Sequence, residues 1–211
     1  MAASPASPAD RLVRVDAAGT VLREYVPEDE NDLVAAFADA EIMRWNPGPA
    51  VPDAAVEYMA ERNDWSDGSH ASWAVADAAD RLVGSVSVHR IDADQGDAEI
   101  GYWVAPWGRR RGHATRAVVG ACGFAFSRLG LHRLYLYHAV ENPGSCAVAT
   151  AAAFLHEGTL RQSYRYPDGR YHDEHLHGIL AADVTGPGGP SAVDEVERRR
   201  LPDLPPPRYL T

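Results

Sequence analysis

The hydrophobic and polar positions of the chain repeat with two periods. Short apolar stretches bounded by turn residues predict strands at residues 20–25, 72–75, 82–89, 97–104, 133–140, 158–166 and 172–180. Helical spacing and helix-start signals predict helices at residues 27–38, 54–62 and 115–128, and an alanine-rich helix that ends at Phe154. This order predicts an α/β fold with a mixed, mostly antiparallel sheet of about six to seven strands and flanking helices.

The helix expected at residues 115–128 has one apolar face of mostly small side chains. Ala117, Ala121 and Ala125 recur along it, together with Val118 and Cys122. A narrow face of this kind lets a helix approach a sheet closely. We therefore expect this helix to pack directly on the sheet.

An arginine-rich turn, Arg109 to Ala114, joins the strand at residues 97–104 to that helix. A strand that passes through a glycine-containing turn into a helix leaves backbone N–H groups without intrahelical partners. The helix dipole adds partial positive charge at the same end, and the arginines add full charges around it. The turn is a candidate site for a phosphate or pyrophosphate, and the alternative is a solvated surface turn.

The length of 211 residues fits one domain. We place this domain at residues 18–184, after an Ala/Ser/Pro-rich flexible arm at residues 1–17. A Pro/Gly-rich linker and C-terminal tail follow at residues 185–211. A second full domain is therefore not expected.

Composition argues against several functional classes. The net charge of -10 disfavours nucleic acid as a partner, because such binding requires a surplus of basic residues. No apolar run reaches membrane-spanning length, so no membrane association is expected. The N-terminus lacks a secretory signal pattern and the chain has 2 cysteines, which together predict a cytoplasmic protein.

Several separated segments narrow the class further. The order of elements and the Arg-x-x-Gly-x-Ala turn resemble the GNAT superfamily of acyl-CoA-dependent N-acyltransferases over about residues 18–182. Five segments are similar to the branch typified by ribosomal-protein alanine acetyltransferases; they begin at Glu41, Glu99, Leu129, Glu141 and Glu157 and read EIMRW, EIGYWV, LGLHRL, ENPGS and EGTLR. One departure is Ala153, where the branch has glycine.

The resemblance implies acetyl-CoA as the cosubstrate. In the family, two neighbouring strands splay around the pantetheine arm, and here these would be residues 97–104 and 133–140. The residues expected to bind the cosubstrate are those of the phosphate turn and the strand before it, with Asn142 and Ser145: Tyr102, Trp103, Val104, Arg109, Arg111, Gly112, His113, Ala114 and Thr115. Gly112 lets the backbone approach a phosphate without a Cβ in the way.

Transfer of an acyl group to an amine requires a neutral amine and a proton for the departing thiolate. Glu99 resembles the general base of the family, and the alternative is a carboxylate paired with an arginine on the sheet surface. Ser145 resembles the group that protonates the thiolate, and the alternative is the N-cap of the next helix. Asn142 would hold CoA or the loop.

The acceptor pocket is expected to use Met43, Trp45, Asn46, the helical region near Tyr58, and the loop at residues 166–171, which ends at Tyr171. The alternative for each of these is an ordinary core or hairpin residue. The side chain of His113 is expected to face solvent. The group formed by His172, His175 and His177 is read as polar decoration of a surface strand, so no metal is expected. Cys146 beside Ser145 is read as a packing residue, and the alternative is an acyl-cysteine relay.

These observations predict a cytoplasmic acetyltransferase that acts on a primary amine by direct transfer from acetyl-CoA. The amine is either the α-amine of a protein N-terminus or a small molecule such as an antibiotic. A non-catalytic acyl-CoA sensor or scaffold is the main alternative, and a nucleotide-binding module is disfavoured because the Gly-Lys-Ser/Thr sequence is absent. Members of the branch are often dimers, so a homodimer remains open.

Overall fold

The computed structural model describes residues 13–14 and 19–185, and among them one sheet of eight strands dominates. Residues 13–14 of the predicted N-terminal arm form a strand, and the rest of the arm lies outside the described residues. The tail beyond residue 185 also lies outside them. The strands are β1 (Val13–Arg14), β2 (Val21–Arg23), β3 (His70–Ala76), β4 (Leu82–Asp92), β5 (Asp97–Val104), β6 (Arg133–Ala139), β7 (Leu155–Arg165) and β8 (Tyr171–Leu180).

The strand order is β1-β2-β3-β4-β5-β6-β8-β7. Neighbouring strands are antiparallel except β5 and β6, which run parallel. That parallel pair is joined through a helix, as the connection between parallel strands requires. The expected α/β fold and mostly antiparallel sheet are confirmed.

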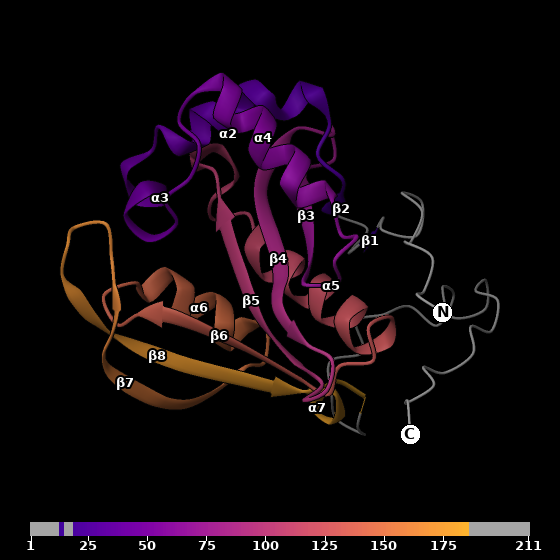
Figure 1. The fold of residues 1–211 in the computed structure, drawn as a ribbon, viewed down its shortest axis with the longest axis vertical. Coiled ribbons are helices and arrows are strands. Elements are labelled where there is room, and N and C mark those ends of the chain that lie inside the picture. The colour runs from indigo at the N-terminus through magenta and orange to yellow at the C-terminus, as the bar shows by residue number, and fades with distance from the viewer. Residues whose placement is uncertain (1–12, 15–18, 186–211) are drawn as a thin grey trace.

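The helices cover both faces of the sheet (Figure 1). Their bounds are η1 (Pro27–Asp29), α2 (Glu30–Phe37), α3 (Ala40–Trp45), α4 (Pro52–Asn63), η2 (Pro106–Gly108), α5 (His113–Ser127), α6 (Pro143–Ala151) and α7 (Ala181–Thr185). Helices α2, α3 and α4 gather at one end of the sheet, and α6 lies beside β6. No helix among the described residues is both long enough and apolar enough to cross a membrane.

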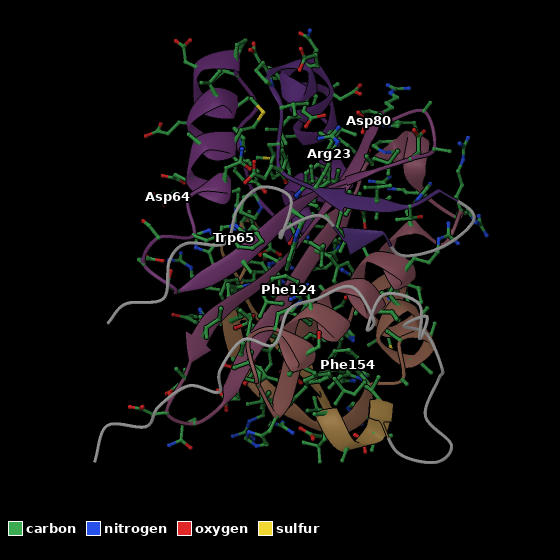
Figure 2. The ribbon with its side chains drawn as sticks, turned by 90° about the vertical axis from the view of Figure 1, so that its right-hand side faces the viewer. Arg23, Asp64, Trp65, Asp80, Phe124 and Phe154 are labelled. Carbon is green, nitrogen blue, oxygen red and sulfur yellow. The ribbon has the colours of Figure 1, made fainter. Side chains whose placement is uncertain are left out.

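The larger core lies between the sheet and helices α5 and α6. As expected, α5 presents small residues to the sheet, and Ala117, Ala121 and Ala125 are fully buried. Trp73 of β3 packs edge-on against Phe124 of α5 at 5.1 Å between ring centroids. The ring of Trp65 contacts both of these rings, and Figure 2 labels Trp65 and Phe124.

A second core lies under α2, α3 and α4. It contains Leu33 and Phe37 of α2, Ile42 of α3 and Trp103 of β5. The sequence pattern did not predict α3, because the segment is too short to show helical periodicity. Asp39 begins this helix by accepting a hydrogen bond from the backbone N–H of Ile42 at 3.1 Å.

Helix α6 ends three residues earlier than predicted. Its last residue is Ala151, and Ala153 then adopts a left-handed conformation with φ of 65°. Glycine favours that conformation at a helix end because it has no Cβ. Ala153, where the similar branch has glycine, thus has a backbone conformation that favours glycine. The helix nevertheless ends just before it, at Ala151.

Candidate functional site

A cleft opens where β5 and β6 separate. The two strands pair only over Asp97 to Glu99 on β5, opposite Arg133 to Tyr135 on β6. Beyond Glu99 they diverge, as Figure 1 shows. The cleft between them has a volume of about 1260 Å³ and extends from the start of α5 to the start of α6. The splayed pair expected from the resemblance is therefore present.

The predicted phosphate turn forms one end of this cleft. Gly112 lies at the N-cap of α5 with φ of 79°, and no side chain caps that helix. Gly112, Ala114 and Thr115 line the cleft. Arg110 also lines it and has φ of 60°, a conformation that is uncommon for a residue with a Cβ. A positive helix end without a side-chain cap fits an anion such as pyrophosphate.

The three arginines of the turn lie in different surroundings. Arg109 is ion-paired with Asp39 and donates a hydrogen bond from Nε to the carbonyl of Val104 at 3.3 Å. Arg110 and Arg111 are exposed, and only Arg110 of these two lines the cleft. Arg109 therefore ties the turn to α3, which leaves Arg110 as the arginine best placed to meet an anion in the cleft.

The prediction that the His113 side chain faces solvent is wrong. His113 is only 6% exposed, and its Nδ1 lies 3.0 Å from the hydroxyl of Thr20. Because His113 begins α5, its backbone still belongs to the phosphate turn. Its side chain instead links α5 to the segment before β2.

The two faces of β5 contribute different chemistry to the cleft. Side chains alternate along a strand, so Ile100 and Tyr102 point to the α5 and α6 side, where both pack in the larger core. Glu99 and Trp103 point to the opposite side, where Trp103 packs in the second core. The cleft is lined by residues of both sides and therefore passes through the split in the sheet.

Tyr102 and Ser145 form a hydroxyl pair. The two hydroxyl oxygens are 2.7 Å apart, and the hydroxyl of Tyr102 also donates to the carbonyl of Ser145 at 3.2 Å. Burial raises the pKa of Tyr102 to about 12, so this phenol keeps its proton at neutral pH. The pair can therefore pass a proton toward the cleft, which both residues line.

Ser145 is not the N-cap of α6. That position belongs to Asn142, whose side-chain oxygen accepts a hydrogen bond from the backbone N–H of Ser145 at 3.1 Å. Capping therefore explains Asn142 and does not explain Ser145. The hydroxyl of Ser145 contacts the hydroxyl of Tyr102 and lines the cleft, where it can contact a bound molecule.

Glu99 lines the cleft and is also ion-paired. Arg90 donates to its carboxylate at 2.7 Å, and Nε2 of His89 lies 3.6 Å from the other oxygen. Burial alone would raise the pKa of Glu99, but the neighbouring His89 and Arg90 outweigh it and hold that pKa below its usual value. Glu99 therefore does pair with an arginine, which was the alternative to its role as a general base. Its lowered pKa keeps the carboxylate ionised at neutral pH, where it lines the cleft.

Aromatic and acidic side chains form the other end of the cleft. Trp45 and Asn46 line it, and the Trp45 ring meets Tyr166 edge-on at 5.3 Å. The hydroxyl of Tyr166 donates to the carboxylate of Glu174 at 2.9 Å, and Glu174 is buried. Tyr166 belongs to the loop at residues 166–171 that was predicted to contribute to the acceptor pocket. Sequence analysis did not predict Glu174 for the cleft, because its place there follows from the pairing of β7 with β8.

Three residues predicted for the acceptor pocket do not line the cleft. Met43 packs against the second core. Tyr58 packs there too, where its ring contacts Phe37 at 5.8 Å. Tyr171 begins β8 and is 62% exposed. Of the predicted acceptor residues, the structure thus brings Trp45, Asn46 and Tyr166 to the cleft.

The histidines near the end of the chain do not all lie on the surface, which corrects their reading as surface decoration. His177 is 2% exposed, and its ring contacts the rings of His138 and His156. His172 instead pairs with Asp168 at 2.9 Å near the hairpin loop. The two-residue spacing of His175 and His177 carries them to the face opposite Glu174.

The GNAT acetyltransferase domain family matches residues 20–154 of the chain. This match covers more than half of the 211 residues, so the chain belongs to the GNAT family. The match contains the split pair of strands and the phosphate turn that form the cleft. The predicted family is confirmed.

Two curated proteins illustrate the similarity in sequence. The spermidine N(1)-acetyltransferase of Vibrio cholerae serotype O1 is 32% identical over 107 residues, which are 51% of this chain and 61% of that protein. The ribosomal-protein-serine acetyltransferase of Escherichia coli (strain K12) is 31% identical over 98 residues, which are 46% of this chain and 54% of that protein. The chain thus spans less than two thirds of each of these curated relatives.

A solved structure supports the fold. Mycobacterium smegmatis RimJ in complex with CoA-disulfide superposes with a TM-score of 0.74 at 23% identity, covering 83% of this chain and 88% of that one. This likeness shows that the two chains share a fold.

Proposed function

We propose that the protein is an acetyl-CoA-dependent N-acetyltransferase that acts on a primary amine by direct transfer. The observation that carries the proposal is the cleft through the split between β5 and β6, with the phosphate turn at one end and Glu99 and the Tyr102–Ser145 pair inside. Acetyl-CoA supplies a thioester, which is an activated acyl group. Family membership supports the same chemistry.

The residues of the turn fit the phosphates of acetyl-CoA. The start of α5 offers backbone N–H groups at Gly112, Ala114 and Thr115, and no side chain caps it. Gly112 allows a phosphate to approach because it has no Cβ. Beyond the turn, the edge of β5 at Tyr102, Trp103 and Val104 faces the cleft and would hold the amides of the pantetheine arm.

Glu99 acts on the amine. An aliphatic amine is protonated at neutral pH and must lose a proton before its nitrogen can attack the thioester carbonyl. Because its pKa is low, Glu99 stays anionic and holds the ammonium form, and it passes the proton to solvent through water. The carboxylates of Glu41 and Glu174 also line the cleft, which supports a cationic acceptor.

The Tyr102–Ser145 pair acts on the leaving group. The amine nitrogen forms a bond to the acyl carbon, and the bond from that carbon to sulfur breaks. The departing thiolate takes the proton of the Ser145 hydroxyl, and Tyr102, 2.7 Å away, returns a proton to Ser145. Solvent then restores the proton of Tyr102. The high pKa of Tyr102 keeps that proton available at neutral pH.

The acceptor is either a small polyamine or a protein N-terminus. The two curated relatives are named for spermidine and for a ribosomal protein, so both classes belong in the test. Both cysteines are free, which supports the proposed cytoplasmic location. A homodimer is tested separately by its mass in solution.

The experiment is acetyl transfer to a panel of amines, read by mass spectrometry of the products and by release of free CoA thiol. The panel contains spermidine, spermine, an aminoglycoside, and peptides that begin with Ser or Ala. Because the 211-residue chain has no lysine, acetylation of its own ε-amines adds no background. We expect one class to be acetylated. Binding of acetyl-CoA with no thiol release on any amine would favour the non-catalytic sensor instead.

A further inference from the structure

Four side chains with metal-ligating atoms meet beneath α6, outside the groups assigned to acetyl transfer. They are His138 of β6, Cys146 of α6, and His175 and His177 of β8, and their ligand atoms all lie within 4.8 Å of one another. Sequence analysis did not find this group, because His138 and Cys146 are distant in sequence from the two histidines of β8. Only the fold brings the four together.

Strand register explains why the histidines share one face. His138 is opposite His175, and Leu136 is opposite His177, in the antiparallel pairing of β6 with β8. Leu134 and Leu136 point into the larger core under α5 and α6, and His138 follows them with the same two-residue period. The N-terminal half of α6 covers this point and contributes Cys146.

Two buried nitrogens of this cluster lack hydrogen-bond partners among the described residues. His138 and His177 are 4% and 2% exposed. Nδ1 of His175 and Nδ1 of His177 are buried and have no hydrogen-bond partner among the described residues. Buried polar atoms are nearly always satisfied in folded proteins, so an unpartnered one calls for an explanation such as an ion or a water. An imidazole offers one nitrogen to a given ion, so Nδ1 of His175 can bind an ion that Nε2 of His138 and Nε2 of His177 also bind.

The geometry at His138 is that of a metal ligand. Its Nε2 lies 3.2 Å from Nε2 of His177. Two nitrogens bound at about 2.0–2.1 Å to one tetrahedral zinc are separated by about 3.3 Å. Its other nitrogen, Nδ1, lies 2.8 Å from the carbonyl of Ala139, and metal-bound histidines are commonly oriented by such a hydrogen bond.

We propose that His138, Cys146, His175 and His177 form a zinc site that joins β6, β8 and the start of α6. Three imidazoles and a thiolate are a ligand set that favours Zn²⁺ over Mg²⁺ or Ca²⁺, which prefer oxygen. The expectation of no metal depended on an exposed strand, and this face is covered. Cys146 then serves as a ligand, neither as a packing residue nor as an acyl-cysteine relay.

The test measures the metal directly and uses the full chain with an affinity tag that contains no histidine. We expect the purified protein to hold one Zn²⁺ per chain by elemental analysis, or to take up one after treatment with a chelator. Co²⁺ in place of zinc should give the visible absorption of a tetrahedral site and a thiolate-to-cobalt band in the near ultraviolet.

Two pairs of variants assign the ligands. Cys146→Ala should abolish the thiolate band, whereas Cys122→Ala, which removes the buried thiol of α5, should keep it. His177→Ala should lower zinc affinity at least 100-fold, whereas His132→Gln, at an exposed histidine, should not change it. If a variant fails to fold, the wild-type protein still decides the matter. A folded wild-type chain that binds neither Zn²⁺ nor Co²⁺ at one per chain, or a thiolate band retained in Cys146→Ala, would overturn the proposal.

Discussion

The hydroxyl of Tyr102 lies 2.7 Å from the hydroxyl of Ser145, although the two residues are 43 positions apart in the chain. One belongs to β5 and the other to α6, so the contact bridges the split between β5 and β6. Asn142 caps α6, and Ser145 is therefore available for chemistry. The assignment of these hydroxyls to the leaving thiolate leads to the first prediction.

Tyr102→Phe and Ser145→Ala should each lower kcat about 10- to 100-fold, because general acid catalysis contributes about 10²–10⁴ and water replaces part of it. The affinity for acetyl-CoA should change less than about threefold, since neither hydroxyl holds the phosphates. Steady-state kinetics and calorimetric titration measure the two effects. The double variant should be little slower than the slower single variant, because the hydroxyls act as one relay.

Tyr135→Phe is the matched control for Tyr102→Phe. Tyr135 is on the neighbouring strand β6 and does not line the cleft. The kcat of the Tyr135→Phe variant should equal that of the wild-type enzyme. If Tyr102→Phe and Ser145→Ala both retain the wild-type kcat, the pair has no part in transfer.

Glu99→Gln should lower kcat/KM about 10- to 100-fold near neutral pH. The loss should shrink as pH rises toward the pKa of the acceptor amine, because the amine then loses its proton to solvent. The low pKa of Glu99 means that this carboxylate is ionised throughout the neutral range. The acid limb of the wild-type pH profile of kcat/KM should therefore reflect the pKa of the acceptor amine and not that of Glu99. A pH profile of kcat/KM for both enzymes checks this.

Glu157→Gln serves as the control for Glu99→Gln, since Glu157 pairs with Arg133 and does not line the cleft. Its pH profile should match that of the wild-type enzyme. A deficit in Glu99→Gln that stays constant at all pH values would assign Glu99 to structure and not to proton removal.

Gly112→Ala should weaken acetyl-CoA binding about 10-fold or more, which corresponds to about 1.4 kcal/mol. An added Cβ would lie 2.7 Å from Nη1 of Arg116, at φ of 79°, and would intrude where the backbone must meet a phosphate. Titration with acetyl-CoA measures the change.

Gly130→Ala is the control at the other end of α5. Gly130 has φ of 70°, and nothing lies within 4 Å of its ideal Cβ position. Both substitutions should cost about 1 kcal/mol of stability through backbone strain. Only Gly112→Ala should weaken the binding of acetyl-CoA. Equal affinity in the two variants would exclude the turn as the phosphate site.

The metal-free protein should lose stability as pH falls from about 6.5 to about 4. The pKa of His177 is lowered to about 4 in the folded chain, so the unfolded chain binds more protons in that window. The stability that His177 contributes is complete above 6.5 and is lost as pH falls through about 4. The loss should be about 1–3 kcal/mol.

Denaturant unfolding at several pH values, with a chelator present, measures this slope. His177→Gln removes the titrating group and should flatten the slope, provided that it folds. His132→Gln, at an exposed position, should keep the slope of the wild-type chain. A wild-type free energy of unfolding that is constant across the window would contradict the buried, neutral state of His177.

Local signals predicted most elements and the phosphate turn. The turn at Gly112 could be predicted because the strand, the glycine and the helix are contiguous in sequence. The contacts of Ser145 and His113 could not, because each depends on a partner far along the chain. The pairing of β6 with β8 decides which histidines are buried, and no local pattern encodes that register. The short helix α3 escaped prediction because six residues show too little periodicity.

The central claim is that the cleft transfers an acetyl group from acetyl-CoA to an amine. The most direct measurement is the rate of free CoA release with the amine panel, together with the mass of each product, for the wild-type chain and the Tyr102→Phe/Ser145→Ala double variant. The account predicts a product heavier by one acetyl group, formed in step with thiol release and at least about 10-fold slower in the double variant. Folded protein that releases no thiol and acetylates no amine in the panel would contradict it.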